Sequence, residues 1–96
     1  MHAVVRAYSG KGAKELFDVL EKRKADVESV MRSVNGFVSY TLSSSGDDHF
    51  SVTVCQDKAG VDESVQKAKE WVAKNAGDTG VGAPKVSDGA VMIHLK

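Results

Sequence analysis

Two stretches with the composition of β-strands, Phe37-Val38-Ser39-Tyr40-Thr41-Leu42 and His49-Phe50-Ser51-Val52-Thr53-Val54-Cys55, lie close together near the middle of the chain. Both are rich in β-branched and aromatic residues, which favour strands. The segment between them, residues 43–48, consists of three serines, a glycine and two aspartates, a composition typical of turns. The sequence therefore predicts a β-hairpin in the middle of the chain.

The hairpin is preceded by a long amphipathic segment, which we expect to form one helix over about residues 11–34. Its apolar side chains recur at helical spacing, with charged residues on the opposite side. They are Leu16, Phe17, Leu20, Val27, Val30, Met31 and Val34. Asn35-Gly36 supplies the left-handed geometry that ends a helix. Residues 3–8, before this helix, have the pattern of a first strand.

After the hairpin, the spacing predicts a second helix over about residues 60–75. Its inner stripe is flanked by Trp71 and consists of Val61, Val65, Ala68 and Val72. A glycine-rich connection over residues 76–84 follows, and residues 86–95 contain the last strand. The predicted order of elements is βαββαβ.

This order predicts an α+β fold of the ferredoxin-like type, a single domain over residues 1–96 with a four-stranded antiparallel sheet. Right-handed crossovers place the strands in the order 4-1-3-2, with both helices on one face. Strand alternation separates two sets of side chains. The more apolar set, which we expect to face the helices, comprises Ala3, Val5, Ala7, Phe50, Val52, Val54, Val91, Ile93 and Leu95.

The opposite face then carries a mixed set of polar and apolar side chains. It comprises His2, Val4, Arg6, Tyr8, His49, Ser51, Thr53, Cys55, Ala90, Met92 and His94. This set is too apolar for a face exposed to water and too polar for a dry core. We therefore expect a homodimer in which two copies pack through these sheet faces.

Three features give the chain a resemblance to a known family. They are a strand directly after Met1, a hairpin entered through Gly36-Phe37-Val38-Ser39-Tyr40, and a helix opened by Asp57-Lys58-Ala59-Gly60-Val61-Asp62-Glu63-Ser64. In these the chain resembles the antibiotic biosynthesis monooxygenase-like family of the dimeric α+β barrel superfamily. The resemblance implies a homodimer and, in enzymatic members, a small-molecule pocket between sheet and helices. Its members include cofactor-independent oxygenases of polycyclic aromatic substrates and haem-degrading enzymes.

Composition narrows the classes of partner and location. Thirteen basic and thirteen acidic residues cancel, so no global positive field favours nucleic acid or an anionic membrane. No stretch has the pattern of a secretory signal or a membrane-spanning helix, and we expect a cytoplasmic protein.

We expect no cofactor and no metal. A dinucleotide loop at Gly10-Lys11-Gly12 lacks its third glycine, because position 15 is Glu15. Haem-degrading relatives shape the haem site with an Asn, a Trp and a His. Only the Trp has a candidate counterpart in this chain, Trp71.

Three residues are candidates for a site that binds a small aromatic molecule. Tyr40 and Trp71 are candidate substrate-binding residues, and His49 is a candidate catalytic base. Cys55 is expected to be a small buried residue rather than a nucleophile. The resemblance implies a cofactor-independent monooxygenase that orients a deprotonated aromatic substrate. The alternative is a non-catalytic dimeric module with a structural or small-ligand-binding role.

Overall fold

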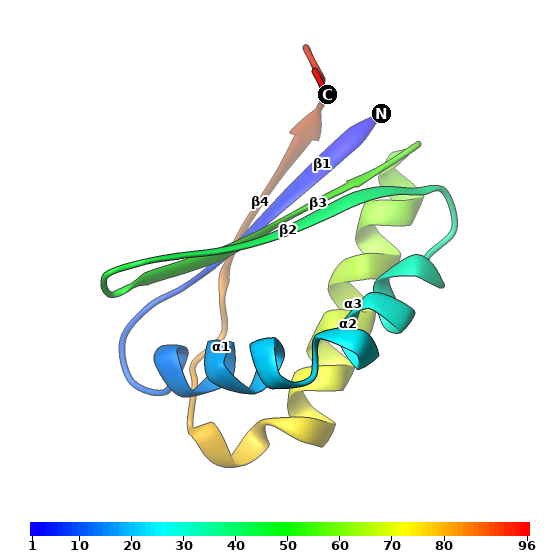
Figure 1. Cartoon of the computed structure of the whole chain (residues 1–96). Helices are drawn as coiled ribbons and strands as arrows, with labels where there is room; N and C mark the ends of the chain where they lie inside the picture. Colours follow the sequence, from blue (N-terminus) through cyan, green and yellow to red (C-terminus); the bar gives the residue numbers. More distant parts are fainter.

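The computed structural model describes residues 1–96 and contains a single antiparallel sheet covered on one face by helices (Figure 1). The sheet has the order β2-β3-β1-β4. Its strands are β1 (His2–Tyr8), β2 (Phe37–Ser45), β3 (Asp48–Cys55) and β4 (Lys85–Ala90). The helices are α1 (Ala13–Lys22), α2 (Lys24–Arg32) and α3 (Lys58–Asn75), followed by a 3-10 turn at Gly77–Thr79. The predicted ferredoxin-like plan and strand order are confirmed.

The hairpin β2–β3 turns through two residues. Ser45 pairs with Asp48, so Gly46 and Asp47 alone form the turn, shorter than the six-residue loop expected from composition. Gly46 has φ 58°, a left-handed conformation that glycine adopts at little cost. The register shifts between Phe37 and Ser39, which marks a bulge where the chain enters β2.

The prediction of one long helix over residues 11–34 is wrong in one respect, because the helix is broken at Arg23. Arg23 has φ −109° and ψ 31°, outside the helical range, and it separates α1 from α2. A straight helix of that length would extend about 36 Å at roughly 1.5 Å per residue. The break allows both Leu20 and Val27 to remain buried against the same sheet.

Helix α3 begins with a side-chain cap and a close contact. The carboxylate of Asp57 accepts a hydrogen bond from the backbone N–H of Gly60 at 3.0 Å. A Cβ atom at Gly60 would lie 2.6 Å from the backbone oxygen of Asn35 and 2.8 Å from Cβ of Cys55. Glycine is therefore required where α3 meets β3 and the turn before β2.

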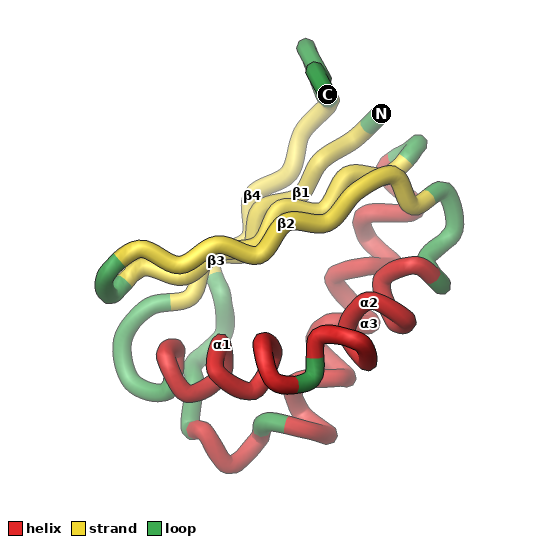
Figure 2. The backbone as a smooth tube through the Cα atoms, in the orientation of Figure 1, coloured by secondary structure: helices red, strands yellow, loops and turns green.

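The assignment of the two sheet faces from the sequence is also wrong. Residues of the mixed set lie against the helices and are buried. They are Val4, Arg6, Tyr8, His49, Ser51, Thr53 and Cys55. Ala3, Val5, Phe50 and Val52, which were expected to face the helices, are half-buried on the other face, where no helix lies (Figure 2). Strand alternation separates the two sets, but a one-residue change of phase decides which set faces the helices.

The last strand is shorter than the predicted span. Strand β4 ends at Ala90, and only the bond from the N–H of Val91 to the carbonyl of Met1 (3.0 Å) continues the pairing with β1. Met92, Ile93 and Leu95 lie beyond the sheet and are 91%, 79% and 87% exposed. Ile93 and Leu95 therefore do not pack under the helices as expected, and Met92 does not lie on the opposite face of the sheet, where it was expected. No helix combines the length and hydropathy needed to cross a membrane.

Candidate functional site

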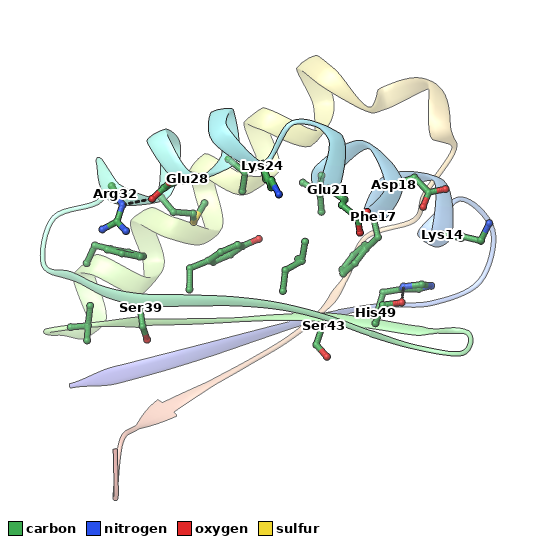
Figure 3. A pocket seen from close by; sticks show the side chains of 18 of the residues that line it. Lys14, Phe17, Asp18, Glu21, Lys24, Glu28, Arg32, Ser39, Ser43 and His49 are labelled. Carbon is green, nitrogen blue, oxygen red and sulfur yellow. Dashed lines mark hydrogen bonds and ion pairs between the residues drawn. The ribbon is translucent and has the colours of Figure 1, made fainter. Parts of the chain in front are cut away.

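A groove of about 860 Å³ runs between helices α1 and α2 and the edge strand β2 (Figure 3). Its charged residues all come from the two helices, and they carry both signs: Lys14, Asp18, Glu21, Lys24, Glu28 and Arg32. Arg32 and Glu28 form an ion pair of 2.8 Å along this rim. The inner wall is mainly apolar and aromatic, formed by Phe17, Leu20, Val27, Met31, Phe37, Tyr40 and Leu42. An apolar groove with a polar rim suits a flat organic molecule.

A second hollow of about 20 Å³, room for one water molecule, lies deeper between the helices and the sheet. Its wall shares six residues with the groove: Phe17, Leu20, Val27, Met31, Tyr40 and Leu42. Only this layer of side chains therefore separates the groove from the deeper hollow, whose polar lining comes from Arg6, Tyr8 and Ser51.

Strand register explains why these polar groups meet. Arg6 of β1 pairs with Ser51 of β3, and Ser51 pairs with Leu42 of β2. The next rows on the same face contain Tyr8 and His49 on one side, and Thr53 and Tyr40 on the other. Side chains in adjacent rows of one face are close enough for long residues to interact.

Arg6 is 4% exposed, and its Nε and Nη1 atoms have no hydrogen-bond partner. The hydroxyl oxygens of Ser51 and Thr53 are likewise buried without a partner. None of the ion pairs of the molecule includes Arg6. The interior thus holds a cluster of unused hydrogen-bonding groups around a cationic side chain.

Tyr40 lines both the groove and the deeper hollow. Burial raises the pKa of its hydroxyl above the usual value of 10.0, and the positive charge of Arg6 partly opposes this rise. At neutral pH Tyr40 is therefore a protonated phenol, and its hydroxyl lies beside Arg6 and Ser51, which line the deeper hollow.

His49 also lines the groove and is 5% exposed. Its Nδ1 atom lies 2.8 Å from the hydroxyl oxygen of Ser44, and its ring packs against Phe17 with 4.9 Å between ring centroids. When Nδ1 carries the proton and donates to Ser44, the lone pair of Nε2 is free to accept a proton. The structure therefore brings two of the three predicted residues, Tyr40 and His49, to the same groove.

Trp71, the third predicted residue, lines neither hollow. Its indole Nε1 donates to a carboxylate oxygen of Asp26 at 3.2 Å, and the guanidinium of Arg23 lies 5.4 Å from the ring centroid. These contacts join α3 to the start of α2. Trp71 thus packs between the helices.

Cys55 is fully buried at the end of β3. Burial raises the pKa of its thiol above 9.0, and the nearby negative charges of Asp57 and Glu63 raise it further. A thiol held in its protonated form is a poor nucleophile. Cys55 therefore acts as a small packing residue.

Sequence reasoning missed Arg6 as a site residue, because it placed Arg6 on the face away from the helices. One signal was present: Arg6 alternates in phase with Val4 and Tyr8, and an arginine between two such residues on one face of a central strand is unusual.

Comparison with known proteins gives structural relatives and no sequence relatives. No family model matches the chain, and no curated protein matches it by sequence. A solved protein of unknown function from Nitrosomonas europaea, NE2512, superposes with a TM-score of 0.72 at 12% identity, covering 99% of this chain and 92% of that one.

Two solved oxygenases are also similar in structure. The ActVA-Orf6 monooxygenase of Streptomyces coelicolor, in complex with nanaomycin D, has a TM-score of 0.66 and 19% identity, covering 99% of this chain and 90% of that one. SnoaB of Streptomyces nogalater, a cofactor-independent oxygenase, has a TM-score of 0.64 and 18% identity, covering 98% and 95%. Dimeric proteins are among the structures that share the fold. The chain thus has the ferredoxin-like fold of antibiotic biosynthesis monooxygenase-like proteins, as the resemblance in its sequence implied.

Proposed function

We propose that this protein is a cofactor-independent monooxygenase that acts on a small aromatic substrate bound in the groove between α1, α2 and β2. The observation that carries the proposal is that a buried histidine, His49, and a half-buried phenol, Tyr40, line the same apolar groove of about 860 Å³. Two proteins of the same fold are oxygenases, and one was solved with a bound ligand. These likenesses support the proposal at the level of the fold.

The groove residues have defined roles in this proposal. Nε2 of His49 accepts a proton from an acidic C–H or O–H group of the substrate, while the Tyr40 hydroxyl donates a hydrogen bond to a substrate oxygen. The resulting electron-rich anion reduces dioxygen directly. A ring CH₂ group and one O₂ give a ring carbonyl and one water, so no external reductant is consumed. The apolar wall holds the substrate and excludes water.

The proposed assembly is a homodimer formed by the sheet faces that carry no helix. Ala3, Val5, Phe50 and Val52 give that face an apolar surface, which favours burial against a second copy. The exposed Met92, Ile93 and Leu95 follow β4 at the sheet's edge and extend the apolar surface available to a partner. This replaces the expected contact, which used the opposite set of residues.

A direct test is oxygen uptake with anthrone, which carries an acidic CH₂ group and yields anthraquinone. In the presence of a metal chelator, we expect the protein to accelerate the consumption of one O₂ per anthrone above the spontaneous rate. His49→Asn should lower kcat by about 10²–10⁴-fold, the usual contribution of a general base. His2→Asn is the matched control, because His2 bonds Asp88 at 2.8 Å and lines neither hollow.

Equal rates with and without the protein would contradict the proposed oxygenase. If anthrone binds in the groove without turnover, the result favours the non-catalytic ligand-binding module instead. If both histidine variants lose the same activity, His49 is not the base.

A further inference from the structure

The deeper hollow beside Arg6 is an incomplete site. Its lining residues come from all the α-helices and from β1, β2 and β3, and none is an aspartate or glutamate. Apart from Arg6, only Tyr8 and Tyr40 among them are titratable. The guanidinium group of arginine remains charged in proteins. The structure therefore buries a positive charge with no counterion inside the protein.

Such an arrangement is costly unless an anion completes it. A buried charge needs a partner of opposite sign and hydrogen bonds to its free atoms. Here Nε and Nη1 of Arg6, together with the Ser51 hydroxyl oxygen beside it, have no partner. These unused groups line or adjoin a hollow of about 20 Å³. That volume holds one oxygen atom and is too small for a phosphate or sulfate group.

The position of the hollow indicates which kind of ligand could supply an oxygen atom to it. The hollow lies behind the inner wall of the groove and shares Tyr40, Leu42 and Phe17 with it. An aromatic molecule in the groove that carries an oxygen on its ring edge could place this oxygen towards Arg6 when the shared side chains shift.

From this geometry we infer that Arg6 is a specificity-determining residue that binds the anionic oxygen of an aromatic phenolate or enolate, with the ring in the groove. This inference rests on the proposed aromatic site but goes beyond it, because it specifies the charge of the ligand and the residue that recognises it. Ser51 donates the second hydrogen bond to the same oxygen. A neutral aromatic molecule of equal shape leaves the Arg6 charge unpaired and binds more weakly.

The test uses 4-nitrophenol and its neutral methyl ether, 4-nitroanisole, as a matched pair. The phenol and phenolate forms of 4-nitrophenol have different absorption bands, so the spectrum of the bound probe reports its ionisation state directly. We expect the wild-type protein to bind 4-nitrophenol at least tenfold more tightly than 4-nitroanisole. We also expect a bound probe that remains ionised at least one pH unit below the pKa of the free probe, because a nearby cation favours the anion.

Substitutions of Arg6 separate recognition from structure. Arg6→Met should abolish the preference for 4-nitrophenol and return the bound probe to the spectrum of the neutral phenol. Arg6→Lys, which keeps the positive charge, should retain part of the preference. Lys69→Met removes a positive charge at an exposed position of α3 outside both hollows and should behave as wild type.

Unfolding in urea without any probe gives an independent readout. A buried charge without a partner costs stability, so Arg6→Met should unfold at the same urea concentration as wild type or at a higher one. A large fall in the midpoint would show that Arg6 has partners within the folded protein and would overturn the inference.

The two proposals fail in different ways. Equal binding of both probes to the wild-type protein would overturn the role of Arg6 and leave the aromatic groove intact, with water filling the hollow. Failure of both probes to bind would overturn the groove as an aromatic site, and the inference with it.

Discussion

Tyr40 lines both the groove and the deeper hollow, and the pKa of its hydroxyl reports how far this region is shielded from water. Burial raises the pKa of its hydroxyl, so the folded protein holds this proton more tightly than the unfolded chain does. Stability linked to Tyr40 is therefore fully present below about pH 10, the unfolded value, and is lost as the pH rises through the higher folded pKa.

We predict that the free energy of unfolding falls less steeply above pH 10 in Tyr40→Phe than in the wild-type protein. Because the chain has only two tyrosines, an ultraviolet titration of wild type minus Tyr40→Phe isolates this phenol. A difference curve centred at or below the pKa of free tyrosine would contradict the burial of Tyr40.

Gly60 is the residue with the least room for a side chain at the start of α3. We predict that Gly60→Ala lowers the free energy of unfolding by about 1–3 kcal/mol, because the new methyl group would overlap the backbone oxygen of Asn35 and Cβ of Cys55. Gly77→Ala is the matched control, since nothing lies within 4 Å of a Cβ at that position. Urea unfolding of both variants gives the comparison, and similar values for the two would contradict the close contact.

At the residue scale, the sequence indicated Tyr40 and His49 by their chemistry, a phenol that can donate a hydrogen bond and an imidazole that can act as a base, and the structure places both on the groove. It could not predict the place of Trp71, because the stripe of α3 does not show which partner an indole meets. Arg6 was missed for a different reason. Its role depends on the phase of β1 relative to the helices, and only the three-dimensional structure sets that phase.

Among the elements, the break between α1 and α2 is the feature that the sequence pattern did not predict. Leu20 and Val27 are seven residues apart, about two helical turns, so the apolar stripe stays in phase across the polar residues around Arg23, and helix propensity is high on both sides. What stops the helix is tertiary contact: the Arg23 guanidinium donates to Asn75 at 2.7 Å and to Asp26 at 2.8 Å, and it lies over Trp71. Asn75 and Trp71 are distant from Arg23 in sequence, so no local pattern reveals these two contacts.

We predict that Arg23→Ala destabilises the fold more than Arg32→Ala does. Arg23 links the start of α2 to α3 through a hydrogen bond to Asn75 and a cation–π contact with Trp71, and it also bonds Asp26 within α2. The loss of these contacts should cost about 1–2 kcal/mol. Arg32 is more exposed and pairs with Glu28 within one helix, a type of contact worth about 0.3–0.5 kcal/mol. Chemical denaturation of the two variants gives the comparison. A larger loss of stability in Arg32→Ala than in Arg23→Ala would show that the contacts of Arg23 do not stabilise the break between α1 and α2.

On the scale of the whole molecule, a single layer of helices covers one face of the sheet and leaves the other without a partner (Figure 2). The sequence indicated correctly that helices cover only one face of the sheet. It reversed the two faces, because it gave the more apolar set to the helices. The polar members of the mixed set line the two hollows under the helices: His49 lines the groove, and Arg6, Tyr8 and Ser51 line the deeper hollow.

The proposed dimer predicts that Val52→Glu disrupts assembly. Val52 pairs with Val5 on the face without helices, so the change would bury a carboxylate from each copy in the interface. A buried unpaired charge costs about 3–5 kcal/mol, which is roughly a hundredfold or more in the dissociation constant.

Sedimentation equilibrium should give twice the mass of one chain for the wild-type protein and the mass of one chain for Val52→Glu. Ala73→Glu, on the exposed side of α3, should remain a dimer. A dimer that tolerates Val52→Glu would place the interface elsewhere.

The central claim is that the groove between α1, α2 and β2 binds a small aromatic molecule, and a nuclear magnetic resonance titration tests it most directly. We predict that 4-nitroanisole, added to the isotopically labelled wild-type protein, shifts the amide signals of groove residues such as Phe17, Tyr40 and His49. Signals of Val5 and Val52 on the opposite face should stay in place. Shifts confined to that opposite face, or no shifts at any residue, would contradict the account.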